Sequence, residues 1–197
     1  MESIEFKIKN ALNNHGVIAF PTETVMGLGV YFDDEIALSK LNMVKGRPEN
    51  KPYTLMLSSV DEIAQYAKIS EKSYRIIRKF MTGPLTVLIP IKENLPYWLD
   101  YGSGKIGIRV PSYEPTLKVL KAAKKGLLVP SANISGNPPA LTSDEAKKIF
   151  GNSIDLIIEG SSNSGIPSTI VDLTDKDIKI IREGTITKED ILKALEE

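Results

Sequence analysis

Hydrophobic residues recur at two spacings along this chain, and the two spacings predict its helices and strands. Residues 3–14 place apolar side chains on one helical face, at Ile4, Ile8, Ala11 and Leu12. Capping residues and apolar periodicity predict further helices over 34–44, 70–80, 115–124, 143–150 and from 187 onward, with Ser70 as the cap of the second. Ser59 and Glu62 form a possible capping box for one more helix. Short apolar or alternating runs predict strands over 17–20, 53–57, 85–89, 106–110, 126–129, 156–159, 169–173 and 178–181.

The order of these elements predicts a mixed sheet. Helices and strands alternate early in the chain, and a strict alternation would give a purely parallel sheet. The strands cluster late, however, and their short links favour antiparallel pairs. Because no repeat, low-complexity tract or linker interrupts the sequence, we expect residues 1–197 to form a single α/β domain.

Composition narrows the possible classes of protein. Of the 197 residues, 42% are hydrophobic and 25% charged, which is ordinary for a protein with a packed core. The chain has no cysteine, so it has no disulfide, cysteine nucleophile or thiolate metal site. The 25 basic and 25 acidic residues cancel, which argues against a general RNA-binding module.

The N-terminal residues show no targeting signal. They lack the basic start, apolar stretch and small-residue cleavage site of a signal peptide. No run in the chain approaches the ~18 apolar residues of a membrane span. We therefore expect a cytoplasmic protein with no membrane contact.

Four polar loops are the candidate functional regions. They are rich in Ser, Thr and Asn and cover Pro21–Gly29, Lys45–Pro52, Pro130–Pro139 and Gly160–Thr169. Loops on a rigid scaffold often carry binding residues, although each of these could be a simple turn. Four such loops in one small chain favour a site.

Cationic residues in and near these loops suggest an anionic ligand. Lys45 and Arg47 flank a glycine and could converge on a polyanion, with Lys51 close by; a solvated basic loop is the alternative. Arg109 interrupts an apolar strand, so it either faces solvent, which the pattern alone favours, or reaches into a cleft toward a carboxylate. Arg182, at the end of another predicted strand, could likewise face solvent or reach into a cleft.

Other polar residues are weaker signals. Ser131, Asn133 and Ser168 could fix polar atoms of a substrate or merely close turns. Asp172 could hold a magnesium ion, but it is a lone carboxylate. His15 is placed for a structural role at a helix end.

Two nucleotide-binding motifs are excluded. The spacing G-x-G-x-x-G occurs at 102–107, but it runs into a strand and not a helix. The P-loop pattern is absent, so any ATP site is of another kind.

At the four loops and two strand ends, the chain resembles the YrdC-like threonylcarbamoyl-AMP synthases. The resemblance extends from Gly16 to Gly184, and although each motif is short, their number, order and spacing are specific. The matching motifs are Pro21-Thr22-Glu23-Thr24 with Gly27-Leu28-Gly29, Lys45-Gly46-Arg47-Pro48, Gly107-Ile108-Arg109-Val110-Pro111, Pro130-Ser131-Ala132-Asn133 with Ser135-Gly136, Ser168-Thr169-Ile170-Val171-Asp172, and Arg182-Glu183-Gly184.

The resemblance implies a fold and an activity. The fold would be a single-domain, YrdC-like twisted mixed sheet, flanked by helices around a concave electropositive cavity, in the short form without an extra C-terminal domain. The enzyme would be a nucleotidyltransferase that joins L-threonine, bicarbonate and ATP, bound with Mg²⁺, into threonylcarbamoyl-AMP and pyrophosphate. The product would serve threonylcarbamoyladenosine modification of tRNA, completed by downstream transfer proteins.

The resemblance also implies roles for individual residues. Nucleotide contacts would come from Lys45, Arg47, Lys51, Asn133 and Arg182, the first two being the catalytic cations. The threonine site would be lined by Thr24, Arg109, Ser131 and Ser168, and no protein ligand is assigned to a metal.

The sequence departs from the family pattern at three positions. Met26, Met56 and Lys105 stand where the family often has tyrosine, histidine and threonine. Two alternatives therefore stay open. One is a module that binds double-stranded RNA or tRNA, and the other is a paralogous carbamoyl-adenylate enzyme with another substrate.

Overall fold

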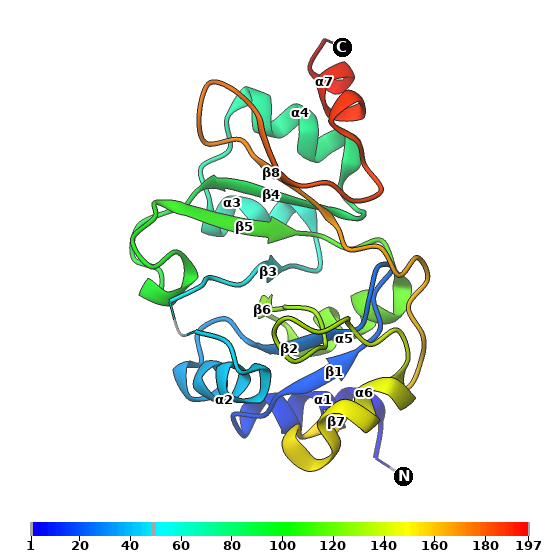
Figure 1. The fold of residues 1–197 in the computed structure, drawn as a ribbon. Coiled ribbons are helices and arrows are strands. Elements are labelled where there is room, and N and C mark those ends of the chain that lie inside the picture. Colours follow the sequence, from blue (N-terminus) through cyan, green and yellow to red (C-terminus); the bar gives the residue numbers. More distant parts are fainter. Residues whose placement is uncertain (1, 49, 197) are drawn as a thin grey trace.

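A computed structural model describes residues 2–48 and 50–196, in which nine strands form one sheet (Figure 1). The strand order is β7-β1-β2-β6-β3-β5-β4-β8-β9. The strands are β1 (Ile18–Phe20), β2 (Gly27–Tyr31), β3 (Leu55–Met56), β4 (Leu85–Pro90), β5 (Lys105–Arg109), β6 (Leu127–Leu128), β7 (Leu156–Ile157), β8 (Thr169–Asp172) and β9 (Lys179–Arg182).

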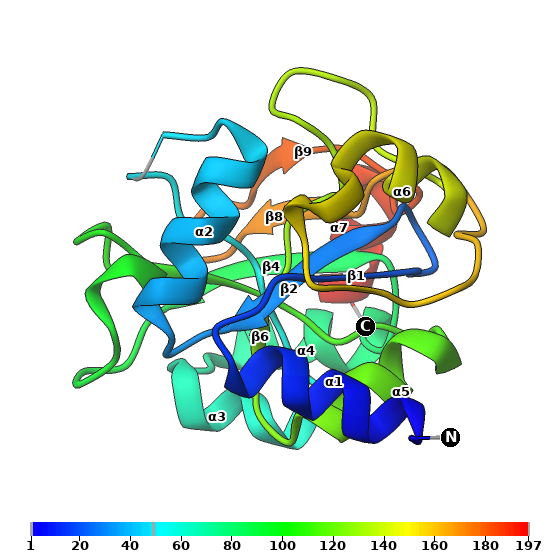
Figure 2. The same cartoon turned by 90° about the horizontal axis from the view of Figure 1, so that it is seen from below.

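Helices cover both faces of this sheet. Figure 2 shows α1 and α5 on one face of β1 and β2, with α2 and α6 on the other. The α-helices are α1 (Ile4–Asn13), α2 (Glu35–Lys45), α3 (Ile63–Tyr66), α4 (Glu71–Phe80), α5 (Glu114–Ala123), α6 (Ser143–Phe150) and α7 (Lys188–Glu196). Short 3₁₀ turns lie at Val60–Glu62, Tyr97–Leu99 and Gly151–Ser153.

Strand pairing confirms the predicted mixed sheet. β1 pairs with β2, β4 with β5 and β8 with β9 in antiparallel fashion, whereas β1–β7, β3–β5 and β4–β8 are parallel. The expectation that short links pair the late strands holds only for β8 and β9. β7 pairs with β1 at one edge of the sheet, and the chain then crosses to the far side before β8 (Figure 1).

β2 is the strand that sequence reasoning missed. Residues 21–29 are predicted to form a loop because of their glycines, but β2 begins at Gly27 and is buried throughout. A Cβ at Gly27 would lie 2.7 Å from Val129 Cγ1, and one at Gly29 would lie 2.7 Å from Phe20 Cε1. These glycines therefore allow close packing inside a strand and do not mark a turn.

Helix ends follow the predicted capping chemistry with one exception. The Ser70 hydroxyl accepts a bond from the Ser73 backbone N–H and starts α4, as predicted. The capping box predicted at Ser59 and Glu62 is wrong. Ser59 instead caps a 3₁₀ turn, and Glu62 accepts a hydrogen bond from Ser58 Oγ at 2.5 Å.

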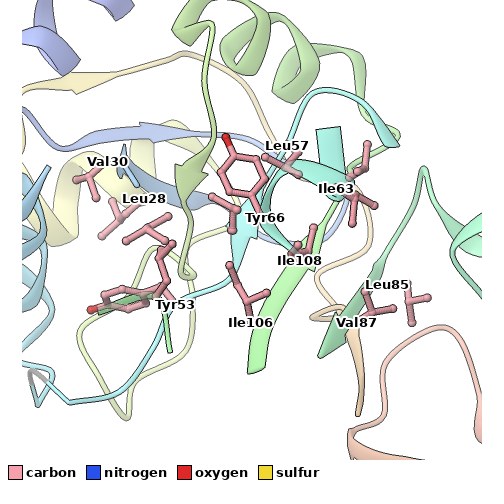
Figure 3. Packing of buried hydrophobic residues seen from close by; sticks show 14 of the residues in the cluster. Leu28, Val30, Tyr53, Leu57, Ile63, Tyr66, Leu85, Val87, Ile106 and Ile108 are labelled. Carbon is pink, nitrogen blue, oxygen red and sulfur yellow. The ribbon is translucent and has the colours of Figure 1, made fainter. Parts of the chain in front are cut away.

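A continuous hydrophobic core fixes the strands beneath the loops. Figure 3 shows Leu28 and Val30 of β2, Ile106 and Ile108 of β5 and Val87 of β4 packed together with side chains of α3. Burial of this kind contributes ~25 cal/mol per Å² of apolar surface, so the strand ends that carry the polar loops are held rigidly. No helix in the described residues is long and apolar enough to span a bilayer.

Candidate functional site

Segments distant in sequence meet around one cavity of about 340 Å³. It lies where β3, β5 and β9 end, where β8 begins and beside the loop that follows β6. Of the nine predicted site residues, seven line it, namely Thr24, Arg47, Arg109, Ser131, Asn133, Ser168 and Arg182. Lys45 and Lys51 are not among the lining residues.

Arg109 is buried at the end of β5 and lines the cavity. The strand pattern alone favoured a position facing solvent, and that expectation is wrong. Its Nη1 donates to Thr24 Oγ1 at 3.1 Å, and its Nε donates to the carbonyl of Gly83 at 3.3 Å. Nη2 lies 2.9 Å from Glu23 Oε1 as an ion pair, without hydrogen-bond geometry. The guanidinium is therefore held from three sides, and its Nη2 makes no hydrogen bond in the described residues.

Glu23 is a residue that sequence reasoning did not assign to the site. Its side chain is 11% exposed, and its Oε1 also accepts a hydrogen bond from the Ser112 backbone N–H at 3.1 Å. Its Oε2 is buried without a hydrogen-bond partner in the described part of the chain. Glu23 lies within the Pro21–Thr24 motif, and this was the one sequence signal that could have assigned it to the site.

Arg182 and Ser168 form another part of the cavity lining. Arg182 Nε donates to the Ser168 carbonyl at 2.9 Å, and Nη2 donates to Ser168 Oγ at 3.1 Å. Ser168 Oγ is also 3.0 Å from Thr86 Oγ1, another lining residue that the sequence did not reveal. Burial, and then the positive charge of Arg109, lowers the pKa of Arg182, because the two cations share one cavity.

Arg47 enters the cavity from a loop. Gly46 adopts the left-handed conformation (φ +57°) that ends α2 and turns the chain toward the cavity. The Arg47 guanidinium lies 4.5 Å from the centroid of the Tyr53 ring, and its Nη2 donates to the Pro52 carbonyl at 3.2 Å. In the described residues, no carboxylate pairs with it, and its Nε is buried without a partner.

Lys45 lies beneath the cavity at the end of α2 and is 2% exposed. Its ammonium donates to the carbonyls of Ser131 and Asn133 at 2.6 and 2.8 Å and to Asn133 Oδ1 at 3.3 Å. Burial, and then the charge of Arg47, lowers the pKa of Lys45 to about 8. Lys51 is exposed in the loop before β3, so the structure does not bring it into the cavity.

The possible magnesium ligand Asp172 is already bound within the protein. Its Oδ2 accepts from Lys105 Nζ at 2.6 Å, and its Oδ1 accepts from Thr174 Oγ1 at 2.6 Å. Burial alone would raise the pKa of Asp172, but the hydrogen bonds from Lys105 and Thr174 lower it overall. Within 2–48 and 50–196, no three His, Asp or Glu residues gather into a metal site.

Of the other residues that the sequence singled out, Met56 lines the cavity, whereas Met26, His15 and the 102–107 glycine motif do not. Met26 is fully buried and is not a lining residue, whereas Met56 lines the cavity and is the register partner of Arg109 in the adjacent strand. His15 Nδ1 lies 2.8 Å from Asp34 Oδ2, which matches the structural role predicted for it. The 102–107 glycine motif enters β5, as expected from its rejection as a dinucleotide site.

Comparisons with known proteins show which family the chain belongs to. The Sua5/YciO/YrdC family model, described as telomere recombination, matches residues 10–184. A Pyrococcus abyssi protein named threonylcarbamoyl-AMP synthase is 33% identical over 198 residues, which is 98% of this chain but only 58% of that protein. A Buchnera aphidicola protein of the same name is 34% identical and is matched over 94% of its length by 82% of this chain.

The fold shows the same relationship. A structure of P. abyssi Sua5 complexed with L-threonine superposes with a TM-score of 0.91 at 32% identity, over 99% of this chain and 59% of that one. Because the family model covers residues 10–184 and the fold superposes closely on that structure, this protein is a member of the Sua5/YciO/YrdC family.

Proposed function

We propose that the protein is an L-threonylcarbamoyladenylate synthase. The observation that carries the proposal is the convergence of Arg47, Arg109 and Arg182 with hydroxyl side chains in one cavity. The names of the relatives and the L-threonine complex of P. abyssi Sua5 support this substrate choice. The class of reaction is nucleotidyl transfer.

The reaction makes few demands on acid–base chemistry. Threonine and bicarbonate give an N-carboxylated threonine whose carbamate oxygen is already anionic. That oxygen attacks the α-phosphorus of ATP, a new P–O bond forms, and pyrophosphate leaves with the electron pair of the broken P–O bond. A chain with one histidine and no cysteine suits a step that requires alignment and charge neutralisation.

The amino-acid end of the cavity would be organised by Arg109. A guanidinium pairs with a carboxylate through two parallel hydrogen bonds, and Glu23, Thr24 and Gly83 hold this one in a single orientation. The hydroxyls of Ser131 and Ser168 line the same cavity and would bind the polar atoms of threonine.

The nucleotide end would be organised by Arg47 and Arg182, with a longer-range attraction from the exposed Lys51. Asn133 lines this end, but its amide is already bonded within the protein. Arg47 has no protein counter-charge in the described residues, so it is suited to bind phosphate oxygens. Since those residues hold no metal site, Mg²⁺ would enter with the ATP phosphates and neutralise their charge. Holding the reactants in line removes about 7–11 kcal/mol of the barrier in favourable cases.

The cellular role follows from the product. We propose that threonylcarbamoyl-AMP is passed in the cytoplasm to proteins that transfer the threonylcarbamoyl group to tRNA. Direct binding of tRNA or other double-stranded RNA to this chain is a further possibility that the zero net charge does not favour.

Product identification tests the proposal directly. The protein is incubated with ATP, Mg²⁺, bicarbonate and threonine, each omitted in turn, and the products are identified by mass spectrometry. We expect threonylcarbamoyl-AMP and an equal amount of pyrophosphate only when all are present. An RNA-binding module would give neither product. A paralogue would use another amine in place of threonine. Because the apolar Met56 lies beside Arg109, a panel of other amino acids is assayed as well.

A further inference from the structure

The ammonium group of Lys45 has no proton left for a ligand. A lysine ammonium carries three N–H donors. In Lys45 these have three acceptors within hydrogen-bond distance, two carbonyls and one amide oxygen, all in the segment 131–133. The side chain is almost completely buried and does not line the cavity.

The amide of Asn133 is similarly committed. Its Oδ1 accepts from Lys45 Nζ and from Ser131 Oγ, the latter at 2.6 Å. Its Nδ2 donates to the carbonyls of Ile134 and Asn137, both at 2.9 Å. Both lone-pair positions of the oxygen and both protons of the nitrogen are therefore in use.

The backbone of Lys45 holds the same loop. The Lys45 carbonyl at the end of α2 accepts a hydrogen bond from the Ser135 N–H at 2.8 Å. One residue thus binds the loop 131–137 through both its side chain and its main chain. The loop in turn carries Ser131 and Asn133 into the cavity.

We infer that Lys45 is a positioning residue whose ammonium fixes the loop 131–137 from beneath, and that it does not contact the nucleotide. This assignment differs from the direct phosphate contact expected from the sequence. Its effect on substrate binding rests on the proposed function, but its effect on the loop does not. Arg47, two residues later, keeps the donors that face the cavity.

The charges around Lys45 provide a second way to observe its role. Arg47 is the charged group that acts on the pKa of Lys45. Tyr53 donates its hydroxyl to Asn42 Oδ1 and stays neutral, since burial raises its pKa to about 12. With a pKa of about 8, Lys45 becomes a neutral amine in mildly alkaline solution and loses one of its three donors. The grip on the loop should therefore weaken as the pH rises through 8.

Stability should respond in the opposite direction. The pKa of Lys45 is lowered from 10.5 to about 8 in the folded protein, so the unfolded chain binds more protons between these values. The contribution of Lys45 to the free energy of unfolding then rises with pH across that window. A weaker loop in a more stable protein distinguishes local positioning from general loss of structure.

The test compares Lys45→Met with the control Lys40→Met. Lys40 lies on the same helix, but its ammonium pairs with Asp155 at 2.7 Å, away from the loop. We expect faster amide hydrogen exchange in 131–137 for Lys45→Met alone, and at least about tenfold weaker ATP binding, since one charge-assisted hydrogen bond corresponds to such a factor. Wild-type ATP affinity should fall as the pH rises through 8, and this fall should be absent in Lys45→Met.

Two results would overturn the inference. One is unchanged loop exchange and ATP affinity in Lys45→Met together with a large fall in kcat, which would mean direct contact with the reacting groups. If that variant does not fold, the wild-type protein decides, and loop protection that stays constant through pH 8, after correction for intrinsic exchange, contradicts the inference. Wild-type protein that makes no threonylcarbamoyl-AMP would refute the proposed function alone, because loop exchange is measured without substrates.

Discussion

Arg109 and Arg47 lie in the same cavity but are supported in opposite ways. Arg109 is buried at a strand end, where a carboxylate, a hydroxyl and a carbonyl hold it. Arg47 sits on a loop against one aromatic ring and one carbonyl, and among the described residues it has no carboxylate partner. One arginine is part of the protein's framework, and the other receives no counter-charge from residues 2–48 and 50–196.

The difference indicates how the cavity divides its work. A guanidinium with a built-in carboxylate adds little net charge and serves mainly to orient a partner. A guanidinium without one adds a full positive charge and attracts an anion such as a triphosphate. The cavity therefore combines a fixed anchor with a region of uncompensated charge, and variants of the two arginines should fail in different ways.

Arg109→Ala should have the largest effect on stability. It leaves Glu23 buried without its counter-charge, which costs about 3–5 kcal/mol in the free energy of unfolding. Denaturant titration measures this loss, and threonine-dependent pyrophosphate release should also be lost. Adding Glu23→Gln should restore much of the stability but not the activity. A stable Arg109→Ala protein with normal threonine dependence would remove Arg109 from the site.

Arg47→Ala should affect activity and leave the fold intact. Removing one donor that stabilises developing charge typically lowers kcat about 10²–10³-fold. Its contact with Tyr53 is worth only about 1 kcal/mol, so the denaturation midpoint should move little. Arg75→Ala, which removes an exposed arginine of α4 paired with Glu71, is the matched control. Wild-type turnover in Arg47→Ala would contradict the proposed mechanism.

Lys105→Met tests a closed ion pair without an assigned catalytic role. Lys105 helps to hold the pKa of Asp172 below its ordinary value of 3.8. The pair therefore stabilises the fold above pH 3.8, and this contribution is lost as the pH falls through the pKa of Asp172 in the folded protein. We expect a loss of about 1–2 kcal/mol near neutral pH and a flatter decline of stability in acid, with unchanged turnover. Unfolding measured at several pH values gives the comparison. Equal acid sensitivity in both proteins would count against this account.

Lys51→Ala should have the smallest effect. Its side chain is exposed and outside the cavity, so its attraction to phosphates is screened by salt. We expect less than about a threefold change in the KM for ATP, and a smaller one at high ionic strength. A loss as large as that of Arg47→Ala would show that the loop carries Lys51 to the nucleotide when ATP binds.

The sequence predicted most elements of the fold because local signals and tertiary structure agree there. The strands at 85–89 and 106–110 and the helix at 143–150 have clear apolar patterns and caps. β2 was missed because Gly27 and Gly29 suggest a turn, whereas contacts with Val129 and Phe20 explain them. Such close approaches depend on how neighbouring strands pack, and the local sequence leaves no trace of them.

The site was predicted less completely for the same reason. Short motifs pointed to seven residues that line the cavity, but no pattern could decide that Arg109 faces inward. That orientation depends on the burial of both faces of β5 and on Glu23, which is 86 positions earlier and whose side chain reaches Arg109 only in the fold. Thr86 and Tyr53 were missed because an isolated threonine or tyrosine in a predicted strand resembles any sheet residue.

The late position of β8 and β9 has a consequence for synthesis of the protein. A ribosome makes β1 to β6 long before Ser168 and Arg182 emerge, so a nascent chain has every other wall of the cavity but lacks this one. Until β8 is made, the edge of β4 with which it pairs, Leu85–Leu88, stays unpaired and is a site for chaperone binding or aggregation. We expect chains stalled before Thr169 to depend on chaperones and to bind no substrate.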